Sequence, residues 1–282
     1  MDALTTYLLL DGAQIDKPLP CIYSMQSDAT VHLLYQRTAY AEWAEHGPCL
    51  VRTVPDGPLM QHFETHWRGR AGLLLASNAE LDDLLDHLRS LVHARVDGEQ
   101  VVLFRYYDPR ILPLWLESLM TEERDLYLGP VQQIYLPTAE GQDLLIQRGD
   151  QPAELKRYTD EPWLRLNAEQ LDTLSGAKQT LFEERLLEHL LSHFPDDLAH
   201  LDDAQRRQLV RRARDSAAQH GYSSADEVAR WSSLLLICGS DFPQAPEHAR
   251  YRELLAQPGR LPAERLDDLL HAAAHQDKES AV

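Results

Sequence analysis

The stretch VVLFRYYDPR, residues 101–110, combines strong strand-forming residues with a charged side chain placed among them. Alternate side chains of a strand point to opposite faces, and here both faces carry apolar groups, a pattern typical of a central strand. Arg105 would then be buried and would need an acidic partner, because an unpaired buried charge is very costly. Asp108, at the end of the strand, and Asp11, after the first strand of the chain, are the two candidates. We therefore expect Asp11, Arg105 and Asp108 to belong to the structural core.

Strand and helix patterns alternate on both sides of this stretch through the first half of the chain. Asp97 to Gln100 give a hairpin signal between strands expected at 92–96 and 101–106. Strands mixed with helices, together with one hairpin, predict an α/β (α+β) domain with a mixed sheet and flanking helices. Further strands are expected at residues 5–10, 31–35, 49–54, 71–76 and 131–136, and helices at 58–67, 78–90 and 109–119.

The second half of the chain is almost entirely helical in pattern. Asn167–Gln170 and Ser224–Glu227 resemble capping boxes, and each precedes leucines at helical spacing. Pro195 should end the first of these helices, and Gly221 suits the left-handed residue that closes another. These signals predict an all-α helical C-terminal domain.

The character of the sequence changes between residues 137 and 165, where polar residues, Gly and Pro predominate. The expected organisation follows from this change. It comprises a mixed α/β domain over residues 1–137, a linker or peripheral hairpin over 138–165, a helical domain over 166–275 and a frayed tail over 276–282.

The chain of 282 residues carries a net charge of −18. Such a field disfavours contact with nucleic-acid phosphates and anionic lipids, so we expect neither nucleic acid nor a membrane as a partner. The three cysteines, Cys21, Cys49 and Cys238, are odd in number and widely spaced, which fits reduced thiols better than a disulfide framework. The N-terminus has an acid where a secretion signal would be basic. Together these features predict a cytoplasmic protein.

No stretch matches the phosphate-binding, dinucleotide-binding, serine-nucleophile or zinc-protease motifs of well-known enzymes. Two histidine pairs, His62/His66 and His189/His193, share a helix face, but a metal ion would need a third ligand that the sequence does not reveal. With 13 histidines in the chain, such pairs are expected by chance. Adjacent acids indicate solvated helix faces rather than a glycosidase pair. We expect no catalytic residues, no metal and no cofactor.

Five arginines between residues 206 and 214 form the basic cluster of this acidic chain. Arg207, Arg211 and Arg214 lie on one stripe of a predicted helix. The simplest interpretation is that they pair with neighbouring acids. The functional alternative is a docking face for an acidic partner segment, and nucleic acid is disfavoured because no aromatic residues are interleaved. This stripe is the candidate partner-binding site.

The order and spacing of several short motifs over residues 4–136 resemble one known family. These motifs are Leu8–Ala13, Gly47–Val51, His87–Leu91, Val102–Arg110 and Gly129–Val131. The family is that of the type VI secretion system effector chaperones and adaptors, encoded between the spike protein VgrG and its cognate toxin. Cys49 departs from the pattern, since an aromatic residue is more frequent there, while the run from Phe104 to Pro109 is intact.

The resemblance implies a non-catalytic adaptor that binds a cognate secreted toxin (the effector) in the producing cell. It would help to load that toxin onto the tip of the spike protein VgrG. Two alternatives stay open from the residues themselves. One is an immunity-type protein that binds and neutralises a toxin, which the negative charge suits, and the other is a hydrolase with an unrecognised site.

Overall fold

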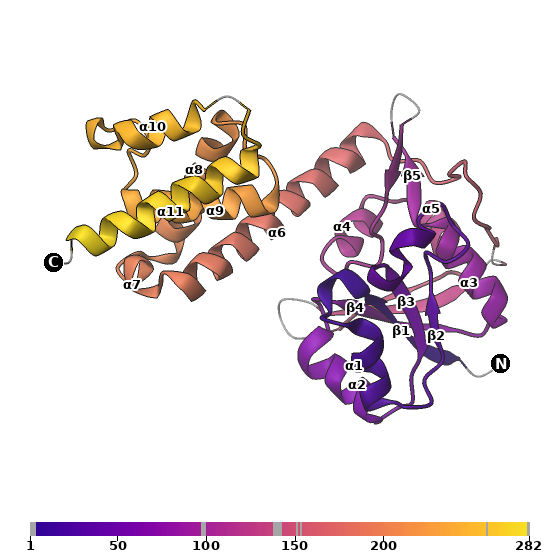
Figure 1. Ribbon diagram of the computed structural model, residues 1–282. Coiled ribbons are helices and arrows are strands. Elements are labelled where there is room, and N and C mark those ends of the chain that lie inside the picture. The colour runs from indigo at the N-terminus through magenta and orange to yellow at the C-terminus, as the bar shows by residue number, and fades with distance from the viewer. Residues whose placement is uncertain are drawn as a thin grey trace. The chain divides into compact units, whose positions relative to one another are not determined.

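The computed structural model describes residues 4–96, 100–137, 143–150, 152, 154–257 and 259–280. The chain divides into two compact units, Met1–Ala177 (unit 1) and Lys178–Val282 (unit 2). Unit 1 combines a sheet with helices, and unit 2 is helical, so the fold class expected from the sequence is confirmed (Figure 1).

A six-stranded sheet organises unit 1, with the strand order β2-β3-β1-β4-β7-β8. All of its pairs among the described residues are antiparallel. The alternating contacts of β1 show why this strand is central: Leu9 packs in one apolar cluster, and Leu8 and Leu10 pack in the other. The strands are β1 (Thr5–Asp11), β2 (Val31–Leu33), β3 (Pro48–Arg52), β4 (Gly72–Ser77), β7 (Val131–Pro137) and β8 (Asp143–Gln147).

Helices cover both faces of this sheet (Figure 1). Ile22 and Leu59 bring α1 and α2 against the face of Leu8, while Leu84 and Trp115 bring α3 and α4 against the face of Leu9. The helices of unit 1 are α1 (Pro18–Met25), α2 (Pro58–His62), α3 (Leu81–Ser90), α4 (Leu112–Glu117) and α5 (Thr121–Leu128), with short turns η1 (Gly12–Gln14), η2 (Ala41–His46) and η3 (Phe63–Trp67).

The stretch expected to form a central strand does not do so. Only Val101–Leu103 is a strand, β6, and it pairs with β5 (His93–Arg95) in a separate two-stranded sheet. Val101 and Leu103 are 43% and 45% exposed. The apolar residues that follow are buried because the chain turns at Tyr106 and Tyr107, and not because a strand alternates between two covered faces. Of the turn expected at Asp97–Gln100, residues 97–99 lie outside the described part of the chain.

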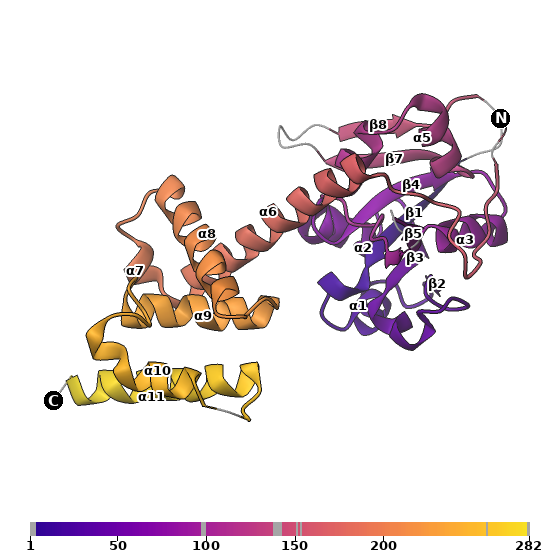
Figure 2. The same cartoon turned by 90° about the horizontal axis from the view of Figure 1, so that it is seen from above.

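Unit 2 is built around its own apolar core, in which Trp231, Leu266 and Leu269 are fully buried. Helix α9 packs against both α8 and α11 (Figure 2). The helices are α6 (Ala168–His193), which begins in unit 1 and continues into unit 2, α7 (Pro195–Leu198), α8 (Asp203–Gln219), α9 (Ala225–Cys238), η4 (Pro246–His248), α10 (Ala249–Leu255) and α11 (Pro262–Ser280). Residues 281–282 of the expected tail lie outside the described part of the chain.

The helix boundaries of unit 2 follow their capping residues. Asn167 and Gln170 bond reciprocally at the start of α6, and Ser224 and Glu227 form the capping box of α9. Gly221, after α8, has a φ of +84°, the left-handed conformation that glycine adopts without strain. These three local predictions are confirmed.

Candidate binding site

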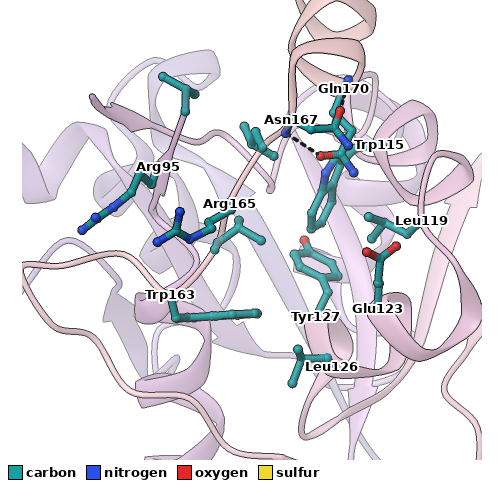
Figure 3. Close-up of a pocket in the computed structure, with 13 residues that line it drawn as sticks. Arg95, Trp115, Leu119, Glu123, Leu126, Tyr127, Trp163, Arg165, Asn167 and Gln170 are labelled. Atoms are coloured by element: carbon teal, nitrogen blue, oxygen red, sulfur yellow. Dashed lines mark hydrogen bonds between the residues drawn. The ribbon is translucent and has the colours of Figure 1, made fainter. Parts of the chain in front are cut away.

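A cavity of about 510 Å³ lies within unit 1, between helices α4 and α5 and the segment of residues 163–167 (Figure 3). Two main-chain hydrogen bonds position this segment beside β5. The Arg95 N–H donates to the Leu164 carbonyl, and the Leu166 N–H donates to the Arg95 carbonyl, each at 2.9 Å. The Trp163 indole N–H donates to Ser90 Oγ at 2.9 Å. The cavity wall is therefore tied to both β5 and α3.

Aromatic rings form the apolar interior of the cavity. Trp115 and Tyr127 are 1% and 3% exposed, and their rings meet edge to face with centroids 4.2 Å apart. Leu119 and Leu126 also line it and are partly exposed. The Trp115 indole N–H is buried and has no hydrogen-bond partner among the described residues. Since buried indole N–H groups usually have an acceptor, this is an open donor position.

Positive groups line the other side of the cavity. Arg95 and Arg165 lie together with Trp163 on the side opposite Leu119 and Glu123 (Figure 3). Arg165 is exposed and forms no ion pair within the described part of the chain. The Arg95 guanidinium lies 3.9 Å from the carboxylate of the exposed Glu161. The N-terminus of α6, where Asn167 and Gln170 also line the cavity, lies beside Trp115 and adds the positive end of a helix dipole there (Figure 3).

Glu123 is the acidic side chain in this lining, and its carboxylate caps the start of α5. It accepts a hydrogen bond of 3.0 Å from the Met120 main-chain N–H at the start of α5. The cavity thus combines two guanidinium groups, an aromatic interior and an unused indole donor. Such a set suits binding of an anionic group joined to an apolar one.

The predicted core residues are only partly brought together. Arg105 pairs with Asp11, whose side chain is 1% exposed, and Asp11 Oδ1 also accepts from the Ala13 N–H at 3.2 Å. Burial raises the pKa of the Asp11 carboxyl, and the Arg105 charge opposes that rise. Asp108 instead holds Arg110 through two hydrogen bonds of 2.8 Å. Of the two acids considered for Arg105, the structure uses Asp11.

A buried hydroxyl pair adjoins this ion pair. The Tyr107 and Tyr35 hydroxyls are 2.8 Å apart, and the Arg105 guanidinium lies 5.8 Å from the centre of the Tyr107 ring. Burial raises the pKa of Tyr107 above its ordinary value. These contacts anchor the turn after β6 to the sheet. Because Tyr35 and Tyr107 are buried, these contacts support the fold and are not exposed to a partner.

The arginine stripe of unit 2 divides into paired and unpaired members. Arg214 pairs with Glu183 and Asp215. Arg207 and Arg211 are exposed on α8 and make no ion pair with any residue that the structure describes. The structure therefore leaves two of the three side chains available to a partner.

The two histidine pairs lie as helical spacing requires. The ring centroids are 4.3 Å apart in both His62/His66 and His189/His193. Across the described ranges, no three His, Cys, Asp or Glu side chains form a group that could hold a metal ion.

Comparison with known proteins finds two similarities. Residues 6–126 match the model described as "Domain of unknown function (DUF4123)". The matched residues lie within unit 1. Over 281 residues, the chain is 25% identical to "Accessory protein VasW" of Vibrio cholerae, covering 97% of this chain and 89% of that protein. The resemblance to the type VI secretion accessory family is thereby confirmed. No solved structure matches the chain.

The DUF4123 match includes part of the cavity lining and leaves part of it out. Arg95, Trp115 and Glu123 lie within the matched residues, whereas Trp163 and Arg165 follow them in the chain. Sequence reasoning missed all of these residues, because no motif marks them. A weak signal was present at residues 163–166, where tryptophan and arginine alternate with two buried leucines as in a short strand.

Proposed function

We propose that this protein is a non-catalytic cytoplasmic adaptor of type VI secretion. It binds a cognate toxin in the producing cell and helps to load that toxin onto the tip of the spike protein VgrG. The observation that carries the proposal is the similarity to an accessory protein, which spans 97% of the chain and so includes residues of both units.

The two units support a role that joins two partners. Each has its own apolar core, so each can present a separate surface without the other. We assign the sheet unit to the common partner, the spike protein, because the family match lies there. The helical unit is then the toxin-specific element.

Surface charge favours protein partners over nucleic acid or lipid. The net charge of −18 repels phosphates, while the exposed Arg207 and Arg211 offer a local site for acidic side chains. Among the described residues, no helix has the length and apolar character required to cross a bilayer.

Deletion of the gene for this protein tests the function in cells. Export of the neighbouring toxin should stop, while secretion of the other components of the machine continues. Unchanged export of that toxin would refute the adaptor function. Adding the purified protein to the purified toxin separates an adaptor from an immunity protein, since only the latter has to abolish toxin activity.

Purified components test the assignment of the helical unit. The double variant Arg207→Gln/Arg211→Gln should weaken toxin binding and leave VgrG binding unchanged. Arg212→Gln is the matched control, because Arg212 is exposed on another face of the same helix. Equal toxin binding by the double variant and the control would remove the arginine stripe from the interface.

A further inference from the structure

We propose that the cavity between α4, α5 and residues 163–167 binds a partner segment in which an acidic residue adjoins an aromatic or large aliphatic residue. The proposal rests on the proposed adaptor function, because it names the chemistry by which unit 1 holds a protein partner. Three features of the cavity each specify one part of that segment.

The positive side of the cavity specifies the acidic residue. Arg165 is exposed and unpaired in the described part of the chain, and Arg95 lies beside it, 3.9 Å from the carboxylate of the exposed Glu161. The carboxylate of Glu123 already accepts the Met120 N–H. In a chain with a net charge of −18, the unpaired positive charge of Arg165 stands out and favours a carboxylate, which a guanidinium can bind through two hydrogen bonds.

The aromatic interior specifies an apolar neighbour for that acid. Trp115 and Tyr127 form the deep part, and the partly exposed Leu119 and Leu126 lead to the surface. A ring or branched aliphatic side chain inserted here would contact the Trp115 and Tyr127 rings and leave water. The volume of about 510 Å³ is within the range of about 300–1,000 Å³ that is typical of binding pockets, and leaves room for more than one side chain.

The unused donor specifies a carbonyl group. Trp115 is 1% exposed and lines the cavity, and its indole N–H has no acceptor among the described residues. A main-chain carbonyl of the bound segment would supply that acceptor. A carboxylate, an apolar side chain and a main-chain carbonyl together are the groups of two adjoining residues in a peptide.

The indole resonance of Trp115 gives a direct readout in the full chain. The protein has five tryptophans, so its ¹H–¹⁵N spectrum has five indole signals, and Trp115→Phe identifies one of them. The probe is the blocked dipeptide N-acetyl-Asp-Phe-amide, titrated to millimolar concentration. It should shift the Trp115 indole proton downfield in a saturable manner, because that proton gains an acceptor. The neutral analogue N-acetyl-Asn-Phe-amide should bind about tenfold more weakly.

The variant Arg165→Gln tests the positive side of the cavity without altering the apolar core. Since Arg165 is exposed, this variant should fold as the wild type does and bind the acidic probe about tenfold more weakly. Arg52→Gln, which removes another exposed arginine of unit 1 outside the cavity, is the matched control and should bind normally.

Several outcomes would overturn the proposal. These are no shift of the Trp115 signal, equal binding of the neutral analogue, and unaltered binding by Arg165→Gln. Binding restricted to N-acetyl-Gly-Phe, whose carboxylate is the free C-terminus, would also overturn it, because the cavity would then recognise a chain end.

A binding assay with the neighbouring toxin and VgrG separates this proposal from the adaptor function. Loss of one partner by Arg165→Gln supports the cavity as a docking site. If the wild type binds both partners and Arg165→Gln binds them equally well, the cavity proposal fails and the adaptor function stands. If the wild type binds neither, the adaptor function itself fails.

Discussion

Acidification from about pH 7.5 to about pH 5 should destabilise unit 1 through one buried histidine, His87 of α3. Its side chain is fully buried. Nε2 lies 2.8 Å from the Tyr127 carbonyl, and Nδ1 lies 3.3 Å from the Lys156 main-chain N–H. A carbonyl can only accept, so Nε2 carries the proton and Nδ1 accepts from Lys156. The neutral ring thus satisfies both neighbours, whereas a second proton would face the Lys156 N–H.

The size of the effect follows from the pKa of His87, which burial lowers from 6.5 to about 4. The folded state binds this proton more weakly than the unfolded state does. The stability that the neutral ring contributes is therefore fully present above the pKa of the unfolded state, 6.5, and is lost as the pH falls toward the folded-state pKa of about 4. Each unit of pKa corresponds to about 1.4 kcal/mol, so the full effect is about 3 kcal/mol. At about pH 5 the expected loss is about 2 kcal/mol.

Urea denaturation at the two pH values, followed by tryptophan fluorescence, measures this loss. The signal reports mainly on unit 1, which contains four of the five tryptophans. Between the two pH values, the unfolding free energy of His87→Gln should fall by about 2 kcal/mol less than that of the wild type. The matched control is His46→Gln, an exposed histidine of unit 1, and it should retain the wild-type pH dependence. Equal pH dependence in the wild type and His87→Gln would refute the reasoning.

Three further substitutions test the packing of unit 1 by the same denaturation assay. Arg105→Ala should cost about 2–3 kcal/mol, less than a fully buried pair because Arg105 is 35% exposed, and adding Asp11→Asn should recover part of it. If Asp11→Asn recovers no stability, the lost ion pair is not the cause of the destabilisation by Arg105→Ala. Gly129→Ala should cost about 2–4 kcal/mol, because φ is +51° and an added Cβ would overlap the His87 ring. Leu103→Ser should lower the unfolding free energy by less than about 1 kcal/mol, since Leu103 is 45% exposed. A loss of about 2–5 kcal/mol would instead indicate that Leu103 is buried, as in the central strand expected from the sequence.

Those elements of the fold whose signals are local could be predicted from the sequence. The strand expected at 131–136 is observed as β7, and the caps of α6 and α9 lie where their side chains indicate. A capping box needs only residues three positions apart, so no distant contact decides it. The same holds for Gly221, where the backbone conformation itself requires glycine.

Features that depend on distant contacts could not be predicted in this way. The apolar side chains on both faces of residues 101–107, Phe104 and Tyr106 among them, predicted a central strand. A turn buries these residues equally well, and the residue pattern does not distinguish the two. The cavity could be predicted even less. A β-bridge joins the main chain at Arg95 and Arg165, which are 70 residues apart in the sequence. That the Trp115 indole N–H has no acceptor among the described residues can be seen only in the structure.

The unit that holds the cavity extends well past the matched residues 6–126. Leu164, Leu166 and Leu174 are buried in the same core as the sheet. Each buried leucine contributes about 1.5–3 kcal/mol, so together they supply about 5–9 kcal/mol, comparable with the net stability of a whole domain. Folding of unit 1 therefore fixes the segment that brings Arg165 to the cavity. This segment lies outside the family match, and so do β7 and β8, so the matched residues 6–126 do not contain all the elements that position the cavity.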